Sequence, residues 1–292
     1  MSGNKQILLV NDLAGYGKVA LSAMMPIMSH MGFEIFTLPT ALVSNTLDYG
    51  KFEILDTKDY IEKTVNVWNE LDFSFESIAI GFIASDEEAD ILADFCDKQS
   101  KKGTFIFVDP IMGDDGRLYN GIAKNAVENR KRLLKFANLI KPNFTECCLL
   151  TGMEYKKEGF SKEENEVMLR KLIGENQSSA VITSVPFEDK KYCLCYDADT
   201  DKIAYIEYDE IDVRFPGTGD IFSAILVGDI LGGKSLFDAT SHAIKVVRNM
   251  INANIKNPNK EKSNATLFSG IPYLYTQFDI NEKIKIGSAF HI

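Results

Sequence analysis

Short apolar runs alternate with amphipathic segments along most of this chain, and this alternation limits the folds that it can adopt. Six runs have the length and composition of buried strands: 6–10, 34–38, 77–83, 104–109, 137–143 and 180–184. Four segments with helical spacing separate strands: 19–32, 86–100, 123–137 and 163–174. The alternation predicts a three-layer α/β fold, with a mostly parallel central sheet and helices on both of its faces.

The alternation ends near residue 190. Two β-rich runs within 190–211 flank the sequence "DADTD" and predict an antiparallel hairpin at one edge of the sheet. Two closing helices are predicted at 220–233 and 235–255, and a C-terminal segment from about 263 to 292 is expected to pack on the surface. The 292 residues are 45% hydrophobic and contain no linker-like stretch, so we expect one domain over 1–292.

The charge balance narrows the range of partners. The chain has 32 Lys and Arg residues against 42 Asp and Glu residues, which gives a net charge of −10. Such a chain has no basic field to attract a nucleic acid or an anionic membrane surface, so neither is expected as a partner. No apolar stretch reaches the roughly 18 residues that a membrane span needs, and the N-terminus does not resemble a signal peptide. We therefore expect a cytoplasmic location.

Three glycine-rich stretches compete as ligand sites. "GYGKVA" at 15–20 follows the first predicted strand and fits a nicotinamide dinucleotide fingerprint, but no acidic residue closes the second strand to hold a ribose. "GDILGGKS" at 228–235 matches the letters of a phosphate-binding P-loop. Because it lies within a helical pattern, we interpret it as the end of one helix and the start of the next.

The third stretch, "PGTGDIFSAI" at 216–225, combines two glycines with the start of a helix. Gly217 and Gly219 let the backbone N–H groups around Thr218 point toward one spot, and the helix N-terminus adds its positive end, which makes an anion hole. A carboxylate there suits catalysis, because Asp220 would accept a proton from an attacking hydroxyl while the amides stabilise a phosphoryl group in transfer. The alternative is that Asp220 only caps the helix.

Oxygen-bearing residues follow two successive predicted strands. Asp109 ends one strand in "VDPIMGDDG", with Asp114 a few residues later, and Asn143 and Glu146 follow the next strand in "KPNFTE". Hard oxygen ligands at one sheet edge suit Mg²⁺ that is bound mainly through water and nucleotide phosphates. We predict that Asp109 and Glu146 serve such an ion, the alternative being ordinary acidic turns.

Together these motifs resemble those of the pyridoxal kinases in the ribokinase-like superfamily. The resemblance covers most of residues 5–255 and is carried by "ILLVNDLAGYG", "GFIAS", "VDPIMGDDGRLY", "IKPNFTECCLLTG" and "GTGDIFSAIL". It implies a ribokinase-like kinase domain, in a homodimer, that transfers the γ-phosphoryl group of ATP to the 5′-hydroxymethyl group of a vitamin B6 vitamer (pyridoxal, pyridoxamine or pyridoxine). Mg²⁺ would be required, with a monovalent cation as a further candidate.

The resemblance also implies roles for individual residues. Asp220 would be the catalytic base, next to the anion hole of Gly217, Thr218 and Gly219, and Asp109 and Glu146 would lie around Mg²⁺ and its waters. ATP would contact Asp109, Asp114, Asn143, Glu146, Thr183, Ser184, Gly217, Thr218 and Gly219, under a closing loop from Asp114 to Tyr119. The substrate would contact Asp12, Tyr16, Ser44, Thr46 and Phe82.

Four features depart from the family pattern, and three of them concern the substrate ring. "SNTLDY" at 44–49 replaces the usual "SNHTGY", Asp12 stands where a serine is usual, and Phe82 stands where a tyrosine is frequent. Lys141 replaces the usual threonine before "PN". The nearest alternative is a hydroxymethylpyrimidine kinase of the same superfamily. More distant alternatives are a protein that binds a nucleotide or vitamer without turnover, and a nicotinamide-dependent enzyme.

Overall fold

The computed structural model describes residues 5–119, 122, 125–174, 176, 178–213 and 215–255, so the predicted surface segment at 263–292 lies outside the described residues. One nine-stranded sheet forms its centre, in the order β11-β10-β9-β8-β5-β4-β1-β2-β3. Its strands are β1 (Gln6–Ala14), β2 (Glu34–Val43), β3 (Ile54–Asp56), β4 (Ser77–Ile80), β5 (Phe105–Val108), β8 (Leu139–Ile140), β9 (Ser179–Phe187), β10 (Lys190–Asp197) and β11 (Lys202–Tyr208). The strands from β9 to β2 in this order are parallel, whereas β3, β10 and β11 pair antiparallel.

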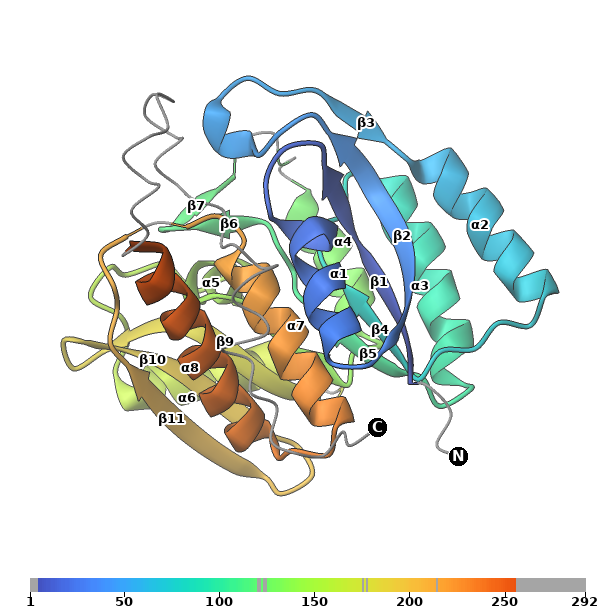
Figure 1. The fold of residues 1–292 in the computed structure, drawn as a ribbon. Coiled ribbons are helices and arrows are strands. Elements are labelled where there is room, and N and C mark those ends of the chain that lie inside the picture. The colour runs from blue at the N-terminus through green and yellow to red at the C-terminus, as the bar shows by residue number, and fades with distance from the viewer. Residues whose placement is uncertain are drawn as a thin grey trace.

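Helices cover both faces of the sheet (Figure 1). One face carries α1 (Ala20–His30), α7 (Thr218–Leu231) and α8 (Leu236–Ile255). The other carries α2 (Lys58–Glu70), α3 (Asp86–Ser100), α4 (Ala126–Leu134), α5 (Phe144–Thr151) and α6 (Lys162–Ile173). Successive side chains of a strand point to opposite faces, so β1 contributes Leu8 and Val10 to one core and Ile7 and Leu9 to the other. Among the described helices, none is both long and apolar enough to cross a bilayer.

The predicted three-layer fold is confirmed, and the predicted edge hairpin forms β10 and β11. Helix α2 and strand β3 were not predicted. The signal for α2 was present in the sequence, because Ile61 and Val65 are buried and Trp68, at the same helical spacing, packs against the same core. The strand predicted at 137–143 is shorter than expected, because Pro142 has no backbone N–H to continue the ladder beyond β8.

Helix α7 is buried on all sides, and this fixes its N-terminus in place. Residues 221–229 are all buried, because α7 packs against α1 and α8 over one face of the sheet. Its sequence is apolar around the whole helix, as a buried helix requires. The residues of "GTGD" therefore begin a rigid element, which holds Asp220 in one position.

A small hairpin lies outside the main sheet. β6 (Gly113–Asp114) and β7 (Arg117–Leu118) pair antiparallel. Asp115 and Gly116 between them have φ values of 48° and 75°, the combination found in a type I′ turn. The Gly116 N–H donates a hydrogen bond to Thr145 Oγ1 on α5 (2.9 Å). The segment expected as a closing loop is thus an ordered hairpin attached to the start of α5.

Candidate active site

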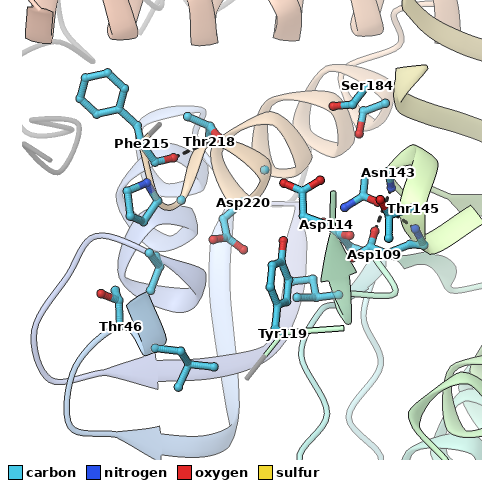
Figure 2. A pocket seen from close by; sticks show the side chains of 18 of the residues that line it. Thr46, Asp109, Asp114, Tyr119, Asn143, Thr145, Ser184, Phe215, Thr218 and Asp220 are labelled. Atoms are coloured by element: carbon cyan, nitrogen blue, oxygen red, sulfur yellow. Dashed lines mark hydrogen bonds between the residues drawn. The ribbon is translucent and has the colours of Figure 1, made fainter. Parts of the chain in front are cut away.

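A cavity of about 990 Å³ lies at the carboxyl ends of the parallel strands, the edge at which α/β sheets bind ligands. Most residues predicted for the site line it: Asp12, Thr46, Phe82, Asp109, Asp114, Asn143, Glu146, Thr183, Ser184, Gly217, Thr218, Gly219 and Asp220. Figure 2 shows Asp220 near its middle, with Thr46 on one side and Asp109, Asn143 and Ser184 on the other. The parallel topology therefore gathers side chains that are far apart in the sequence.

The other two predicted residues, Tyr16 and Ser44, lie outside this lining. Tyr16 is 56% exposed, and its ring packs edge-on against Tyr49 with the ring centroids 6.1 Å apart. The Ser44 hydroxyl donates to Asn45 Oδ1 (2.8 Å) and accepts from the Glu53 N–H (2.9 Å). In this structure Ser44 stabilises the turn after β2 and does not face the cavity.

Two helix N-termini meet at Asp220. Its Oδ2 accepts a hydrogen bond (2.8 Å) from the backbone N–H of Ala20, the first residue of α1, although Asp220 itself lies in the first turn of α7. Asn11 Nδ2 lies 3.5 Å from the other oxygen, Oδ1. Ala20 has a φ of 47°, a strained value for a residue other than glycine. The carboxylate therefore bonds to the neighbouring helix and is not an N-cap of its own.

The surroundings of Asp220 tune its basicity. Burial raises its pKa to about 6; the Ala20 N–H acts in the opposite direction, and the charge of Asp109 adds to the rise. With a pKa near 6 the group is mostly ionised at neutral pH and is a stronger base than an exposed aspartate. These are the properties of a general base that works near pH 7.

The glycines of "GTGD" let the backbone pass close to the loop that follows β1. Gly217 has a φ of 86°, and a Cβ on it would lie 2.3 Å from the Lys18 carbonyl oxygen. Thr218 Oγ1 donates to the Phe215 carbonyl (3.3 Å), a bond drawn in Figure 2. The first N–H groups of α7 have no acceptor within their own helix, so they are available to an anion beside Asp220.

Lys141 and Asp109 form a buried ion pair that lines the cavity. Lys141 Nζ lies 2.5 Å from Asp109 Oδ2, and each side chain is 6% exposed. The same Oδ2 accepts a hydrogen bond from Ser223 Oγ on α7 (2.8 Å). Burial alone would lower the pKa of Lys141, but the charge of Asp109, with smaller contributions from Glu146 and Asp220, outweighs it and raises that pKa. The site therefore contains a buried positive charge of its own, in addition to the more exposed Lys191 on its lining.

Glu146 is bound to backbone groups. With Asn143 it forms a capping box: Asn143 Oδ1 accepts from the Glu146 N–H, and Glu146 Oε2 accepts from the Asn143 N–H (both 2.8 Å). Its Oε1 accepts from the Met112 N–H (2.9 Å). Burial and the charge of Asp109 raise the pKa of Glu146 to about 8. In this structure Glu146 ties the loop after β5 to the start of α5.

Asp12 faces the cavity from β1, opposite a bulge in β2. Burial raises its pKa to about 7, and the charge of Asp220 contributes to the rise. Asp12 can therefore donate a hydrogen bond when protonated, or attract a cation when ionised, within the physiological pH range. With Thr46 and Phe82 it lines the part of the cavity that the sequence assigned to the acceptor substrate.

Three residues that shape the site were not predicted for it: Lys141, Ser223 and Asn11. Asn11 is 1% exposed, and its Oδ1 accepts from the N–H groups of Asp12 (3.0 Å) and Phe82 (2.9 Å), which joins β1 to the segment that follows β4. A polar residue at the end of the apolar run "ILLVN" was a readable signal for this role. Lys141 stood out only as a departure from a family pattern, and Ser223 looked like an ordinary helix residue.

A second cavity of about 240 Å³ adjoins the first and shares Lys141, Thr183 and Ser184 with it. Much of its wall is apolar: Ile211, Phe222, Ile244, Val247 and Ile251. An apolar slot next to an anion-binding turn suits a ligand that has a flat base and a phosphate chain.

The stretch "GDILGGKS" forms the end of α7 and the start of α8, as predicted, and none of its residues lines the described cavities. Lys234 Nζ lies 2.9 Å from Oδ1 of the buried Asp229, and His242 Nδ1 lies 2.5 Å from Oδ2. Ser235 Oγ accepts from the Asp238 N–H (3.2 Å) at the start of α8. This lysine therefore stabilises a helix connection.

A comparison with models of protein families matches residues 22–265 to the phosphomethylpyrimidine kinase family. That range is well over half of the 292 residues. The chain belongs to this family. Because the chain belongs to this family, we do not interpret it as a nicotinamide-dependent enzyme. Within "GYGKVA", the Lys18 carbonyl oxygen lies against Gly217 of the "GTGD" turn.

The chain is also similar to kinases that are named after forms of vitamin B6. A pyridoxine/pyridoxal/pyridoxamine kinase of Bordetella avium is 25% identical over an aligned length of 287 residues, and the match covers 91% of this chain and 93% of that protein. The predicted membership in the pyridoxal kinase family of the ribokinase-like superfamily is therefore confirmed.

Solved structures agree with this assignment. A candidate phosphomethylpyrimidine kinase from Bacteroides thetaiotaomicron, in an orthorhombic form with pyridoxal, has a TM-score of 0.86 and 29% identity, and covers 97% of this chain and 98% of its own. A pyridoxal kinase from Leishmania donovani, in complex with ADP and pyridoxamine, has a TM-score of 0.78 at 23% identity, covering 96% and 97%. The second likeness supports the fold alone.

Proposed function

We propose that this protein is an ATP-dependent kinase that phosphorylates the 5′-hydroxymethyl group of a vitamin B6 vitamer. The observation that carries the proposal is Asp220, a partly buried carboxylate with a raised pKa that lies beside the anion-binding start of α7. Family membership supports the kinase chemistry. The vitamer is suggested by the relative from Bordetella avium and by the neighbour solved with pyridoxal.

In the proposed reaction, Asp220 accepts the proton of the substrate hydroxyl while its oxygen attacks the γ-phosphorus of ATP. The bond between that phosphorus and the oxygen bridging to the β-phosphate breaks, and ADP leaves with the bond electrons. The N–H groups of Gly217, Thr218 and Gly219 would stabilise the charge on the phosphoryl group as it moves. Asp220 then returns its proton to solvent.

We propose that ATP lies along the ends of β8 and β9, with its phosphates near Asn143, Thr183 and Ser184 and its base in the 240 Å³ cavity. Ser184 has a φ of 59° and lies at a bulge in β9, and such strained positions are frequent at ligand sites. The β6–β7 hairpin carries Asp114 at the rim of the cavity. Closure of this hairpin over the phosphates would exclude water and limit ATP hydrolysis.

We also propose that Mg²⁺ enters with the nucleotide. Among the described residues, no group of three or more His, Cys, Asp and Glu side chains could hold a metal ion alone. Asp109 offers a buried carboxylate, whereas both oxygens of Glu146 already accept backbone hydrogen bonds. This donor set fits Mg²⁺, which proteins often hold by one or two carboxylates together with phosphates and water. Bound Mg²⁺ would neutralise charge on the phosphates.

Calorimetry with and without Mg²⁺ tests this assignment. We expect ATP to bind about tenfold or more tightly with the ion, because this acidic site otherwise repels the phosphates. Asp109→Ala should remove most of that gain, and Glu146→Ala should remove less, since its oxygens are held by backbone amides. Equal ATP affinity in the parent with Mg²⁺ and with EDTA would contradict the assignment.

Asp12 gives a pH-dependent prediction. An ionised Asp12 that faces a protonated pyridine ring would stabilise that form of the substrate, whereas a serine can hydrogen-bond to either form. We therefore expect Asp12→Ser to lower kcat/KM for pyridoxal by about tenfold at pH values where Asp12 is ionised and the ring is protonated, and to have little effect where Asp12 is protonated or the ring is neutral. Asp220 titrates in both proteins, so the ratio of the two profiles isolates Asp12.

The competing role for Asp12 is stabilisation of the turn after β1. A ratio of parent to variant that stays constant from pH 5.5 to about 9 would support that role and remove the charge pairing. Pyridoxamine provides a second profile, because its additional amine changes the ionisation of the ring. The KM for ATP serves as a control and should be unchanged.

A substrate panel tests the proposed function itself. ATP-dependent phosphorylation would be measured with pyridoxal, pyridoxamine, pyridoxine and hydroxymethylpyrimidine. The pyrimidine is the second candidate substrate, because the matching family model and the Bacteroides thetaiotaomicron neighbour are both named after phosphomethylpyrimidine kinases. A preference for the pyrimidine would assign the protein to that activity, and binding of all four without turnover would reject a kinase.

We further propose a homodimer that forms through the β2–β3 edge. Leu42 and Leu55 lie opposite each other in this antiparallel pair and are 42% and 62% exposed, and Tyr60 nearby on α2 is 53% exposed. Exposed apolar side chains on an edge strand favour association. Sedimentation should show a dimer for the parent and a monomer for Leu55→Lys.

The predicted cytoplasmic location stays a prediction.

A further inference from the structure

Lys141 places a buried ammonium group beside the anion-binding turn. Its Nζ lies 2.5 Å from Asp109 Oδ2 and 5.9 Å from the centroid of the Phe222 ring. A Cβ built on Gly219 would lie 3.8 Å from the same nitrogen. Lys141 is 5% exposed as a whole residue, yet it lines both cavities. The group is therefore deep in the protein but open to a bound ligand.

The hydrogen bonds of this ammonium are incomplete within the described part of the chain. An ammonium has three N–H donors, and Asp109 is the acceptor found for Lys141 among the described residues. Ser223 bonds to the same carboxylate oxygen and has no donor role toward a ligand in this arrangement. Remaining donors on Nζ can therefore serve an anion that enters between Asp109 and Gly219.

The charges around Lys141 define its partner. The carboxyl groups of Asp109, Glu146 and Asp220 act on its ammonium, and Asp12 lines the same cavity. A nucleoside triphosphate adds several negative charges to this cluster of carboxyl groups, so phosphoryl transfer here needs a fixed cation close to the phosphate in transfer. Lys141 is the buried lysine that lines the described cavity next to the anion hole.

We propose that the Lys141 ammonium is the resident cation of the phosphoryl-transfer site. It contacts the γ-phosphate of ATP while it keeps its bond to Asp109, and it thereby makes a bound monovalent cation unnecessary for this chain. The inference rests on the proposed kinase function. It also gives a physical meaning to the lysine before "PN", because a neutral threonine there would leave Asp109 without its charged partner.

Two variants and one control test the proposal. Lys141→Thr removes the charge and leaves space for a hydrated ion, whereas Lys141→Met removes the charge and fills the space. Lys234→Ala is the matched control, because it also takes a lysine from a buried aspartate, Asp229, but lies away from the described cavities. Circular dichroism and thermal melting establish that each protein is folded before kinetics and binding are measured.

Activity is measured with Mg²⁺ in tetramethylammonium chloride and in potassium chloride at equal ionic strength. The parent and Lys234→Ala should give rates within about twofold of each other in the two salts. Lys141→Thr should lose about 10- to 100-fold in tetramethylammonium, the loss expected for a charge-assisted hydrogen bond, and should recover in a saturable manner with potassium. Lys141→Met should lose activity in both salts. A parent that needs potassium, or a Lys141→Thr variant with parental activity in tetramethylammonium, would overturn the proposal.

Nucleotide binding separates this inference from the proposed function. Without any acceptor substrate, Lys141→Thr should weaken ATP binding about tenfold and ADP binding much less, because only ATP has the γ-phosphate. This result would support the inference even if no vitamer were phosphorylated by the parent protein. Equal losses for ATP and ADP, or no loss for either, would show that Lys141 does not contact the γ-phosphate.

Discussion

Replacing Asp220 with asparagine is expected to lower kcat by roughly 10²–10⁴-fold, the range for loss of a positioned general base. ATP affinity should stay the same or rise, because the variant removes a negative charge from the cavity that receives the phosphates. The asparagine side-chain oxygen can still accept the hydrogen bond from the Ala20 N–H. Steady-state kinetics and calorimetry on the same preparation measure the two effects.

The same substitution makes a prediction about stability. The pKa of Asp220 is raised from 3.8 to about 6 in the folded protein, so the folded state holds its proton more tightly than the unfolded chain does. This contribution is fully present below pH 4 and is lost as the pH rises through 6. Asparagine does not ionise, so the variant does not lose this contribution. The melting temperature of Asp220→Asn minus that of the parent should therefore increase between pH 4 and 7.

Asp229→Asn is the matched control for Asp220→Asn. Both aspartates lie on α7, but Asp229 is buried and pairs with Lys234 and His242 away from the described cavities, whereas Asp220 lines the larger cavity. The control should lose stability through its ion pairs while it retains activity within a few-fold. Parental turnover in Asp220→Asn would reduce that residue to a structural link between α1 and α7.

The layered fold and the location of the site were both predictable from the sequence. Apolar runs of strand length between helical segments define a parallel sheet, and the carboxyl ends of its strands must then lie at one edge. "GTGD", "VDPIMGDD" and "KPNFTE" each follow a strand, so Asp220, Asp109 and Asn143 come together at that edge as a consequence of topology. Local sequence patterns and the handedness of the connections are enough to predict this placement.

Details that depend on tertiary packing could not be obtained in this way. A bulge in β2 opposite Asp12, and another in β9 beside Ser184, change the register of the strands by one residue without a clear sequence signal. The strained Ala20, whose N–H meets Asp220, is part of an ordinary helix start in the sequence. The Lys141–Asp109 ion pair joins two loops, and a single sequence carries no distance between them.

Gly217→Ala is expected to lower kcat/KM by about 10²-fold or more, because it displaces the groups that act on the phosphate. Its methyl group would meet the Lys18 carbonyl oxygen at 2.3 Å, a separation that real Cβ atoms do not adopt. Either the "GTGD" turn or the loop before Ala20 must then move, and both contribute to the hydrogen bond between Ala20 and Asp220. A displacement of about 1 Å near reacting atoms is enough for a loss of this size.

Gly233→Ala is the control that separates displacement of the "GTGD" turn from the backbone strain of an alanine with a positive φ. Gly233 has a φ of 92°, close to the 86° of Gly217, but a Cβ on it would have no atom within 4 Å. Both variants therefore incur the roughly 1–2 kcal/mol that a left-handed conformation costs an alanine, and only Gly217→Ala adds a collision. Gly233→Ala should melt at a lower temperature and keep its activity, whereas Gly217→Ala should lose both. If the two variants lost stability equally and both retained activity, the turn would tolerate movement. The proposed phosphoryl transfer would then not depend on the exact position of the α7 N–H groups.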